Sequence, residues 1–197
     1  MIDCISISAA ITYKPTLDKR SGDMWLGGVV LVPEKCPVTR KVKCYKAKER
    51  NLLITYYQRD STITIKNSLH KYSKDNNYSE ITFTELSKAI SDIAYTVGIP
   101  ASEFEVKRLE VGFNIETTEK PSTYLPLFTI FKNRELDKMK KDAFWYGVKW
   151  IFSEYQLKIY DKTEEVKRHD RIQLPQDILR FELRGCTYRQ AGRANTA

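Results

Sequence analysis

Three stretches of the chain alternate apolar and polar residues with a period of two: residues 106–116, 155–162 and 178–184. This alternation is typical of a β-strand that has one face in a core. We expect the apolar faces to share one core and the polar faces to form one exposed sheet surface. The apolar positions are Leu109, Val111, Phe113 and Ile115 in the first stretch, Leu157 and Ile159 in the second, and Leu179, Phe181 and Leu183 in the third.

The clearest helix is predicted over residues 84–97, where apolar residues recur at steps of three and four. Thr82 or Thr84 can cap its start, and Gly98 followed by Pro100 ends it. A second, shorter helix is predicted over residues 121–131, with residues 132–142 as a charged connector or a continuation of it. Residues 163–169 are predicted to form a short polar helix or a loop, and residues 71–79 a loop.

The remaining β-rich stretches predict further strands over residues 2–13, 25–32, 51–58, 62–66 and 144–152. Strands in hairpins, interrupted by one or two helices, indicate an α+β fold with a mainly antiparallel sheet. We expect the helices to pack on one sheet face and the catalytic residues to lie on the other.

The chain has 197 residues, of which 42% are hydrophobic, enough for one domain with a proper core. We therefore expect a single domain over residues 1–184 and a short tail over residues 185–197, which is a possible truncation point. No apolar run reaches the roughly 18 residues of a membrane span. The start lacks the features of a signal peptide, which predicts a cytoplasmic protein without a membrane partner.

The sequence argues against several kinds of site. The four cysteines show no paired spacing, so neither a zinc site nor a disulfide scaffold is expected. His70 and His169 lie far apart, so the paired-histidine metal motif of many nicking enzymes is absent. No glycine-rich phosphate loop is present, which makes nucleotide hydrolysis an unlikely activity.

A net charge of +8 points to a polyanionic partner. The cations cluster in residues 14–20, 40–50, 132–141 and 158–171, where aromatic residues are interleaved with them. Cations can follow a phosphate backbone while aromatic rings stack on unpaired bases, so nucleic acid is the favoured partner.

The predicted polar face carries groups suited to phosphodiester chemistry. Tyr160 is flanked by Lys158 and Lys162, and a tyrosine nucleophile needs a cation or a base beside it because its ordinary pKa is near 10. Glu110 and Glu182 are candidate ligands for Mg²⁺ or Mn²⁺. Candidate phosphate-binding cations on this face are Arg108 and Arg180.

At these residues the chain resembles the rolling-circle replication initiators of filamentous phages and related small phages and plasmids, the group without the two-histidine motif. The ordered marks are the opening MID, KNSLHKY at 66–72, RLEVGFN at 108–114, IYDKTEE at 159–165 and LRFELR at 179–184. Such initiators usually continue well past the last of these segments. The resemblance implies a metal-dependent DNA endonuclease and strand transferase that acts on single-stranded or hairpin origin DNA and works with the host replication machinery.

By that resemblance, Tyr160 attacks the origin strand, forms a 5′-phosphotyrosyl link, leaves a free 3′-OH and later reseals the strand. Lys162 is the second catalytic residue, and Glu165 joins Glu110 and Glu182 as a metal ligand. The DNA-binding residues are then predicted to be Arg108, Asn114, Lys158, Arg180, Arg184, Lys66, His70 and Lys71.

Two alternatives stay open at the sequence level. The basic and aromatic content alone also fits a non-catalytic module that binds single-stranded or hairpin DNA, or RNA as a weaker variant. Tyr155 is the nearest competitor as nucleophile, because a register error of one residue would exchange the two faces of its strand. Tyr146 and Tyr188 are further alternatives.

Overall fold

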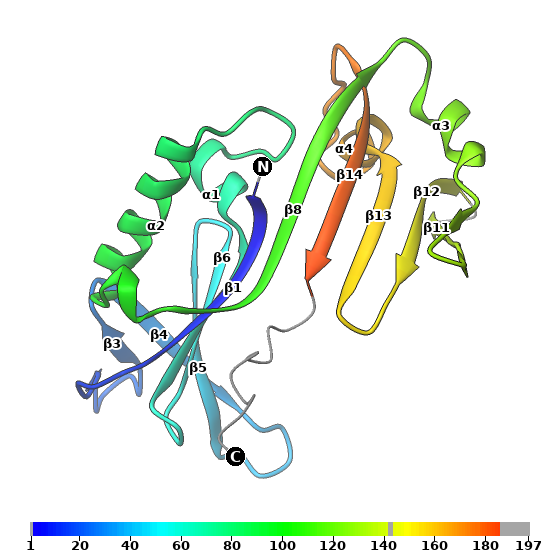
Figure 1. Cartoon of the computed structure of the whole chain (residues 1–197). Coiled ribbons are helices and arrows are strands. Elements are labelled where there is room, and N and C mark those ends of the chain that lie inside the picture. Colours follow the sequence, from blue (N-terminus) through cyan, green and yellow to red (C-terminus); the bar gives the residue numbers. More distant parts are fainter. Residues whose placement is uncertain (1, 142–143, 186–197) are drawn as a thin grey trace, which may run out of the picture. The chain divides into compact units, whose positions relative to one another are not determined.

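The structure is a computed structural model that describes residues 2–141 and 144–185 (Figure 1). It has two compact units, one of residues Ile2–Leu109 and one that begins at Glu110. Both are built on antiparallel strands accompanied by short helices, which confirms the predicted α+β class. The expectation of a single domain over residues 1–184 stays a prediction.

The N-terminal unit is built on a sheet in the order β1-β7-β6-β5-β4-β3-β2. Every neighbouring pair is antiparallel, and β1 pairs along its length with β7 through partners such as Ile7 and Ile65. The strands are β1 (Ile2–Ala10), β2 (Thr16–Leu17), β3 (Met24–Leu26), β4 (Val29–Lys35), β5 (Val42–Glu49), β6 (Leu52–Tyr57) and β7 (Thr62–Ser68).

Two helices, α1 (Leu69–Lys74) and α2 (Phe83–Val97), also contribute to this unit's core, and a short 3₁₀ turn η1 (Ala101–Glu103) follows them. The predicted start of α2 is confirmed, because Thr82 and Glu85 form a reciprocal capping box. Gly98 ends the helix in the left-handed conformation. The buried cluster joins strand residues such as Ile7 and Ile65 to helix residues such as Leu86 and Ile93.

Three local predictions in this unit were wrong. Residues 25–32 belong to the hairpin β3–β4, and β4 continues through Pro33, next to a register shift of the kind where sheets tolerate proline. Strand β5 was not predicted, because its lysines hide the apolar pattern. The predicted loop over residues 71–79 begins within α1, since Ser68 accepts a hydrogen bond from the Lys71 amide and starts a helix there.

The C-terminal unit has strands in the order β11-β12-β13-β14-β8. The long strand β8 (Glu105–Thr117) runs from the first unit into the second, so its predicted range is confirmed. The other strands are β11 (Asp137–Lys141), β12 (Phe144–Ile151), β13 (Tyr155–Asp161) and β14 (Asp177–Gly185). The turn between β12 and β13 lies at the predicted place, and the Phe152 amide donates to the Tyr155 carbonyl across it.

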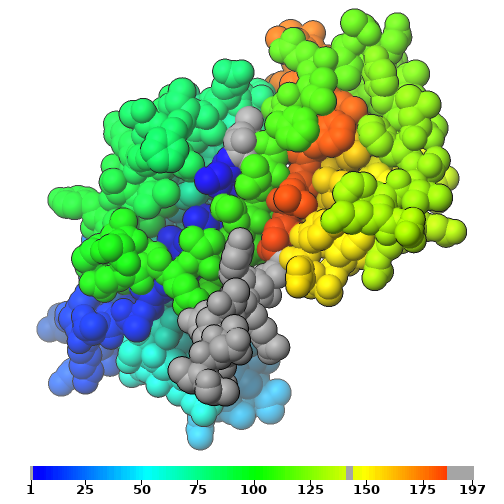
Figure 2. Space-filling view, viewed as in Figure 1, coloured from blue at the N-terminus to red at the C-terminus, as the bar shows by residue number. Residues whose placement is uncertain are grey.

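The segment that connects β8 to β11 lies beside β12 (Figures 1 and 2), and its apolar side chains pack with those of the sheet. That segment contains α3 (Pro121–Tyr124), the 3₁₀ turn η2 (Leu125–Leu127), β9 (Ile130–Phe131) and β10 (Arg134–Glu135). Leu125 is fully buried against Val148, Trp150, Ile159 and Leu179. The apolar faces of β12, β13 and β14 therefore share a core, as expected.

The helical predictions for this unit were partly wrong. Residues 121–131 form only one α-turn, a 3₁₀ turn and a short strand, and the predicted connector over residues 132–142 forms strands up to Lys141. Residue 142 and the predicted tail from residue 186 on lie outside the described residues. The alternative of a helix after Tyr160 is confirmed by α4 (Lys162–His169).

The described residues thus contain four α-helices, where one or two were predicted. The added ones are short, and each starts from a local cap or a proline, a weaker signal than the long apolar stripe of α2. In the part of the chain that the structure describes, no helix is long and apolar enough to cross a membrane.

Gly27, at the turn between β3 and β4, gives a test of this packing. Its φ is +56°, and an added Cβ would lie 2.6 Å from the Val97 carbonyl carbon at the end of α2. We expect Gly27→Ala to lower the free energy of unfolding by about 2–5 kcal/mol, through backbone strain and a clash with backbone.

Gly22 is the matched control, because its φ is +80° and an added Cβ would meet nothing within 4 Å. Gly22→Ala should cost only the strain, about 1 kcal/mol. Urea unfolding measures both variants. Equal losses would contradict the close packing of the β3–β4 turn on α2.

Candidate functional site

The predicted site residues of the C-terminal unit are brought together by strand register. Tyr160 on β13 pairs with Arg180 on β14, which pairs with Asn114 on β8. In the next row of the same face, Lys158 pairs with Glu182. Because side chains alternate along a strand, all five project from one face of the sheet. We call this face the polar face.

Glu182 is the centre of the contacts on the polar face. The Tyr160 hydroxyl donates a hydrogen bond to Glu182 Oε2 at 3.2 Å, and Lys158 Nζ forms an ion pair with Glu182 Oε1. Arg180 Nε lies 3.8 Å from Glu182 Oε2. The carboxylate therefore contacts a phenol, an ammonium and a guanidinium, which is an arrangement able to take a proton from the phenol and to keep positive charge beside it.

Further ion pairs and hydrogen bonds extend this network to β8. Arg184 Nε lies 2.8 Å from Glu110 Oε1, across the pair that these residues form in the sheet. Arg180 also donates a hydrogen bond from one terminal nitrogen to Asn114 Oδ1 at 3.1 Å. Glu110 on β8 and Glu182 on β14, the predicted acidic residues, thus each have a basic partner on a neighbouring strand.

Two glycines that the sequence analysis did not single out make room for these side chains. A Cβ on Gly112 would lie 2.8 Å from a terminal nitrogen of Arg180, so the guanidinium rests over the β8 backbone. A Cβ on Gly147 would lie 2.6 Å from the Cβ of Tyr160. An isolated glycine inside a strand pattern indicates that another group approaches the strand backbone closely. This signal would have identified Gly112 and Gly147 from the sequence.

The prediction that the polar face is exposed was wrong. Relative exposure is 6% for Tyr160, 7% for Glu110, 5% for Glu182 and 0% for Arg180. Neighbouring strands place opposite charges side by side, and paired charges can be buried where isolated ones cannot. On β8 the alternation is inverted relative to the expectation, because Phe113 remains 54% exposed while Glu110 is buried. Other apolar positions of β8 and β14 that stay exposed are Val111, Ile115 and Leu183.

Lys162 was predicted to lie on a strand and to point to the polar face by alternation, but it lies in a helix. It is the first residue of α4 and is fully buried, and its Nζ lies 2.5 Å from Glu165 Oε2 one turn later. Asp161 caps this helix by accepting a hydrogen bond from the Glu164 amide at 2.8 Å. Burial raises the pKa of the Asp161 carboxyl above its ordinary value, although its hydrogen bonds to backbone amides oppose the shift.

The register also separates the competing tyrosines. Tyr155 lies on the apolar side of β13 and stacks on Phe152, with ring centroids 4.6 Å apart. The prediction that Tyr155 and Tyr160 lie on opposite faces of β13 is therefore confirmed. Tyr146 is half-buried on β12, and Tyr188 lies outside the described residues.

Four predicted DNA-binding residues belong to the N-terminal unit: Lys66, His70, Lys71 and Arg108. Lys66 is exposed, whereas His70 is fully buried with its ring near the Ser79 hydroxyl. The motif segments meet here, because the Ser68 hydroxyl donates to buried Asp3 at 2.8 Å. The DNA-binding role of all four residues stays a prediction.

The predicted metal ligands are carboxylates of the type that Mg²⁺ and Mn²⁺ take. In this arrangement each is held by a cation of the chain: Glu110 by Arg184, Glu182 by Lys158 and Glu165 by Lys162. Among the described residues, no group of three or more Asp, Glu, His or Cys side chains converges to hold an ion. The three carboxylates as arranged here therefore do not fit a metal centre, and the metal role stays a prediction.

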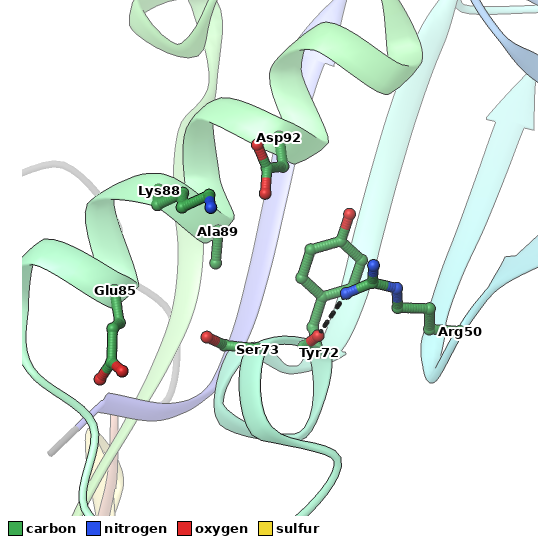
Figure 3. A pocket seen from close by; sticks show the side chains of 7 residues that line it. All are labelled: Arg50, Tyr72, Ser73, Glu85, Lys88, Ala89 and Asp92. Atoms are coloured by element: carbon green, nitrogen blue, oxygen red, sulfur yellow. Dashed lines mark hydrogen bonds between the residues drawn. The ribbon is translucent and has the colours of Figure 1, made fainter.

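A separate pocket of about 310 Å³ lies in the N-terminal unit between α1, α2 and the β5–β6 turn (Figure 3). Arg50 reaches over the Tyr72 ring there and donates to the Tyr72 carbonyl at 2.9 Å. Burial raises the pKa of the Tyr72 phenol. No predicted site residue lines the pocket, whose walls are formed by Arg50, Tyr72, Ser73, Glu85, Lys88, Ala89 and Asp92.

Comparison with known proteins adds no identification. No family model matches this chain, and no curated protein has a matching sequence.

Asp161 provides a pH test of the segment that follows Tyr160. Because its pKa is raised in the folded state, the folded protein holds the proton more tightly, and stability falls as pH rises from the ordinary value of 3.8 through the raised value. Asp161→Asn keeps a capping oxygen without the buried charge. We therefore expect its free energy of unfolding to rise, relative to the native protein, as pH increases through that window.

Asp161→Ala is the control, because it removes the cap and should cost about 1 kcal/mol. Urea unfolding at a series of pH values measures both variants. If the free energy of unfolding of Asp161→Asn differs from that of the native protein by the same amount at every pH, the buried charge of Asp161 is not what sets the pH dependence.

Proposed function

We propose that this protein is a replication initiator that nicks one DNA strand with Tyr160 and later rejoins it. The observation that carries the proposal is the hydrogen bond from the Tyr160 hydroxyl to Glu182, beside Lys158 and Arg180. A phenol paired with a base and flanked by cations is the arrangement that phosphodiester attack by tyrosine requires.

In the proposed reaction the Tyr160 oxygen attacks the phosphorus as its proton passes to Glu182. The bond between phosphorus and the 3′-oxygen breaks, and the 3′-oxygen leaves and takes a proton from water, while the proton on Glu182 passes to the hydroxide that this leaves. The product is a 5′-phosphotyrosyl link and a free 3′-OH. In the reverse direction, a 3′-OH attacks the phosphotyrosine, reseals the strand and returns the proton to Tyr160.

The charge that grows on the phosphoryl oxygens has to be neutralised, and Arg180 and Lys158, which both lie against Glu182, are the cations placed to do so. A divalent ion, expected from the resemblance, would have to displace Arg184 or Lys158 to reach Glu110 or Glu182. No step of the proposed reaction is routed through such an ion. Whether Mg²⁺ or Mn²⁺ is required is a separate arm of the experiment below.

The remaining parts of the proposal concern setting and partners. The substrate is single-stranded or hairpin origin DNA, in keeping with the net charge of +8. The site of action is the cytoplasm of a host cell, where the free 3′-OH primes the host replication machinery.

One observation favours a second function, a non-catalytic DNA-binding module. Tyr160 and Glu182 are both nearly inaccessible, and a buried network of ion pairs and hydrogen bonds can serve stability and specificity of the fold alone. DNA can reach Tyr160 only if this face opens, so the two functions differ in whether Tyr160 ever contacts a phosphate.

The test is covalent capture of labelled single strands that contain phage-type origin sequences. We expect a denaturing gel to show a protein adduct with a 3′-labelled strand and none with a 5′-labelled strand. Tyr160→Phe should abolish the adduct, and Glu182→Gln should slow its formation by about 10²–10⁴-fold. Each strand is tested with Mg²⁺, with Mn²⁺ and with EDTA.

Tyr155→Phe is the matched control, because Tyr155 lies on the same strand but faces the other way. It should form the adduct at the native rate. Tight binding of every strand with no adduct would overturn the nicking function and favour the binding module. An adduct that survives in Tyr160→Phe would assign the nucleophile to another residue.

A further inference from the structure

The hairpin β9–β10 and the β12–β13 turn form a surface of aromatic rings with cations placed over them. Phe131 of the hairpin contacts Phe152 edge to face, with centroids 5.9 Å apart, and Phe152 stacks on Tyr155. Lys132 Nζ lies 5.3 Å from the centre of the Tyr155 ring, and the Arg134 guanidinium lies 5.4 Å from that of Phe152. We call this set the hairpin surface.

The cations of the hairpin surface differ from most lysines with described contacts. Lys46, Lys74, Lys107, Lys158 and Lys162 each pair with a carboxylate. Lys132 and Arg134 are exposed and contact aromatic rings, and neither forms an ion pair with a carboxylate of the described residues. Their positive charge is therefore available to a partner, and when these cations move onto phosphates a base can stack on the ring faces that they now cover.

The backbone of the hairpin tip is strained, and this strain lowers stability. Lys132 and Asn133 have φ values of 48° and 58°, in the left-handed region. A two-residue hairpin turn with positive φ at both positions prefers Asn and Gly, and lysine is disfavoured there. A strained lysine at a tip is a reason to look for a ligand.

We propose that the hairpin surface binds single-stranded DNA, with Lys132 and Arg134 on phosphates and the rings of Tyr155 and Phe152 stacked by bases. Cations that follow the backbone and rings that stack on bases are the two elements of single-strand binding without sequence readout. A duplex would satisfy only the cations, because its bases are already stacked on one another.

The hairpin surface is separate from the polar face. Tyr155 precedes Tyr160 by five residues on β13, about 16 Å along the strand, and faces the opposite side of the sheet. It therefore holds DNA that flanks the reacting phosphate. The identity of the strand as origin DNA rests on the proposed function, but the binding itself does not.

The experiment measures fluorescence anisotropy of a labelled oligothymidine strand and of a duplex over a range of salt concentrations, and neither contains an origin sequence that could be cleaved. The double variant Lys132→Ala/Arg134→Ala should reduce the slope of log K against log salt by about 1.4, the value for two lost phosphate contacts on a single strand. Tyr155→Leu should weaken single-strand binding roughly tenfold and leave duplex binding unchanged.

Lys132→Asn separates binding from folding. Asparagine is favoured at positive φ, so this variant should keep or raise the thermal midpoint while it weakens single-strand binding. Lys35→Ala/Arg59→Ala is the charge-matched control, since both side chains are exposed in the N-terminal unit and lie outside the cation clusters. It should bind the strand with the native slope.

An unchanged slope in Lys132→Ala/Arg134→Ala, or an equal loss in the Lys35 and Arg59 control, would overturn the proposal. These outcomes are distinct from failure of the nicking function, which is the absence of a covalent adduct. Adduct formation with unaltered binding in the hairpin variants would reject the hairpin surface alone.

Discussion

The carboxylate of Glu182 lies among a phenol, an ammonium and a guanidinium, and the C-terminal sheet depends on this neutralisation of charge. A carboxylate without partners is too costly to bury, whereas a paired one can be kept from water. Removing one partner of such a pair typically costs about 3–5 kcal/mol, because the other charge is left behind. The polar face therefore has to form as a set, with β8, β13 and β14 in register.

The need to pair these buried charges also explains why the polar face has glycines at two positions and a long side chain at Arg180. Arg180 can reach both Glu182 and Asn114 because Gly112 leaves the β8 backbone open beneath its guanidinium. Gly147 lets β12 approach Tyr160 closely. On the other side of the sheet, the segment around Leu125 supplies the apolar layer that holds β12, β13 and β14 together.

For function, the arrangement separates two kinds of chemistry on one sheet. The polar face carries a buried phenol and its base, which suits bond breaking once a phosphate has access. The hairpin surface carries exposed cations over aromatic rings, which suits holding a flexible polyanion. Strand β13 carries Tyr155 at its start and Tyr160 near its end. The proposed DNA binding therefore depends on one end of this strand and the proposed nicking on the other.

The sequence by itself determined the long strands, helix α2 and the division of Tyr155 and Tyr160 between two faces. These follow from short-range physics, because the period of a strand is fixed by its backbone and the caps of α2 lie within a few residues of its ends. Glu110, Glu182 and Arg180 were likewise placed on one face with Tyr160 by alternation alone.

Only the tertiary structure decided which of the two faces is covered. Alternation says that the faces of β8 differ, but burial of Glu110 and exposure of Phe113 depend on what distant segments bring to each side. The placement of Lys162 on a helix, the strand β5 and the hairpin β3–β4 were decided in the same way. Opposite charges meet only when β13, β14 and β8 pair, and that pairing joins residues far apart in the chain, beyond the reach of any local pattern.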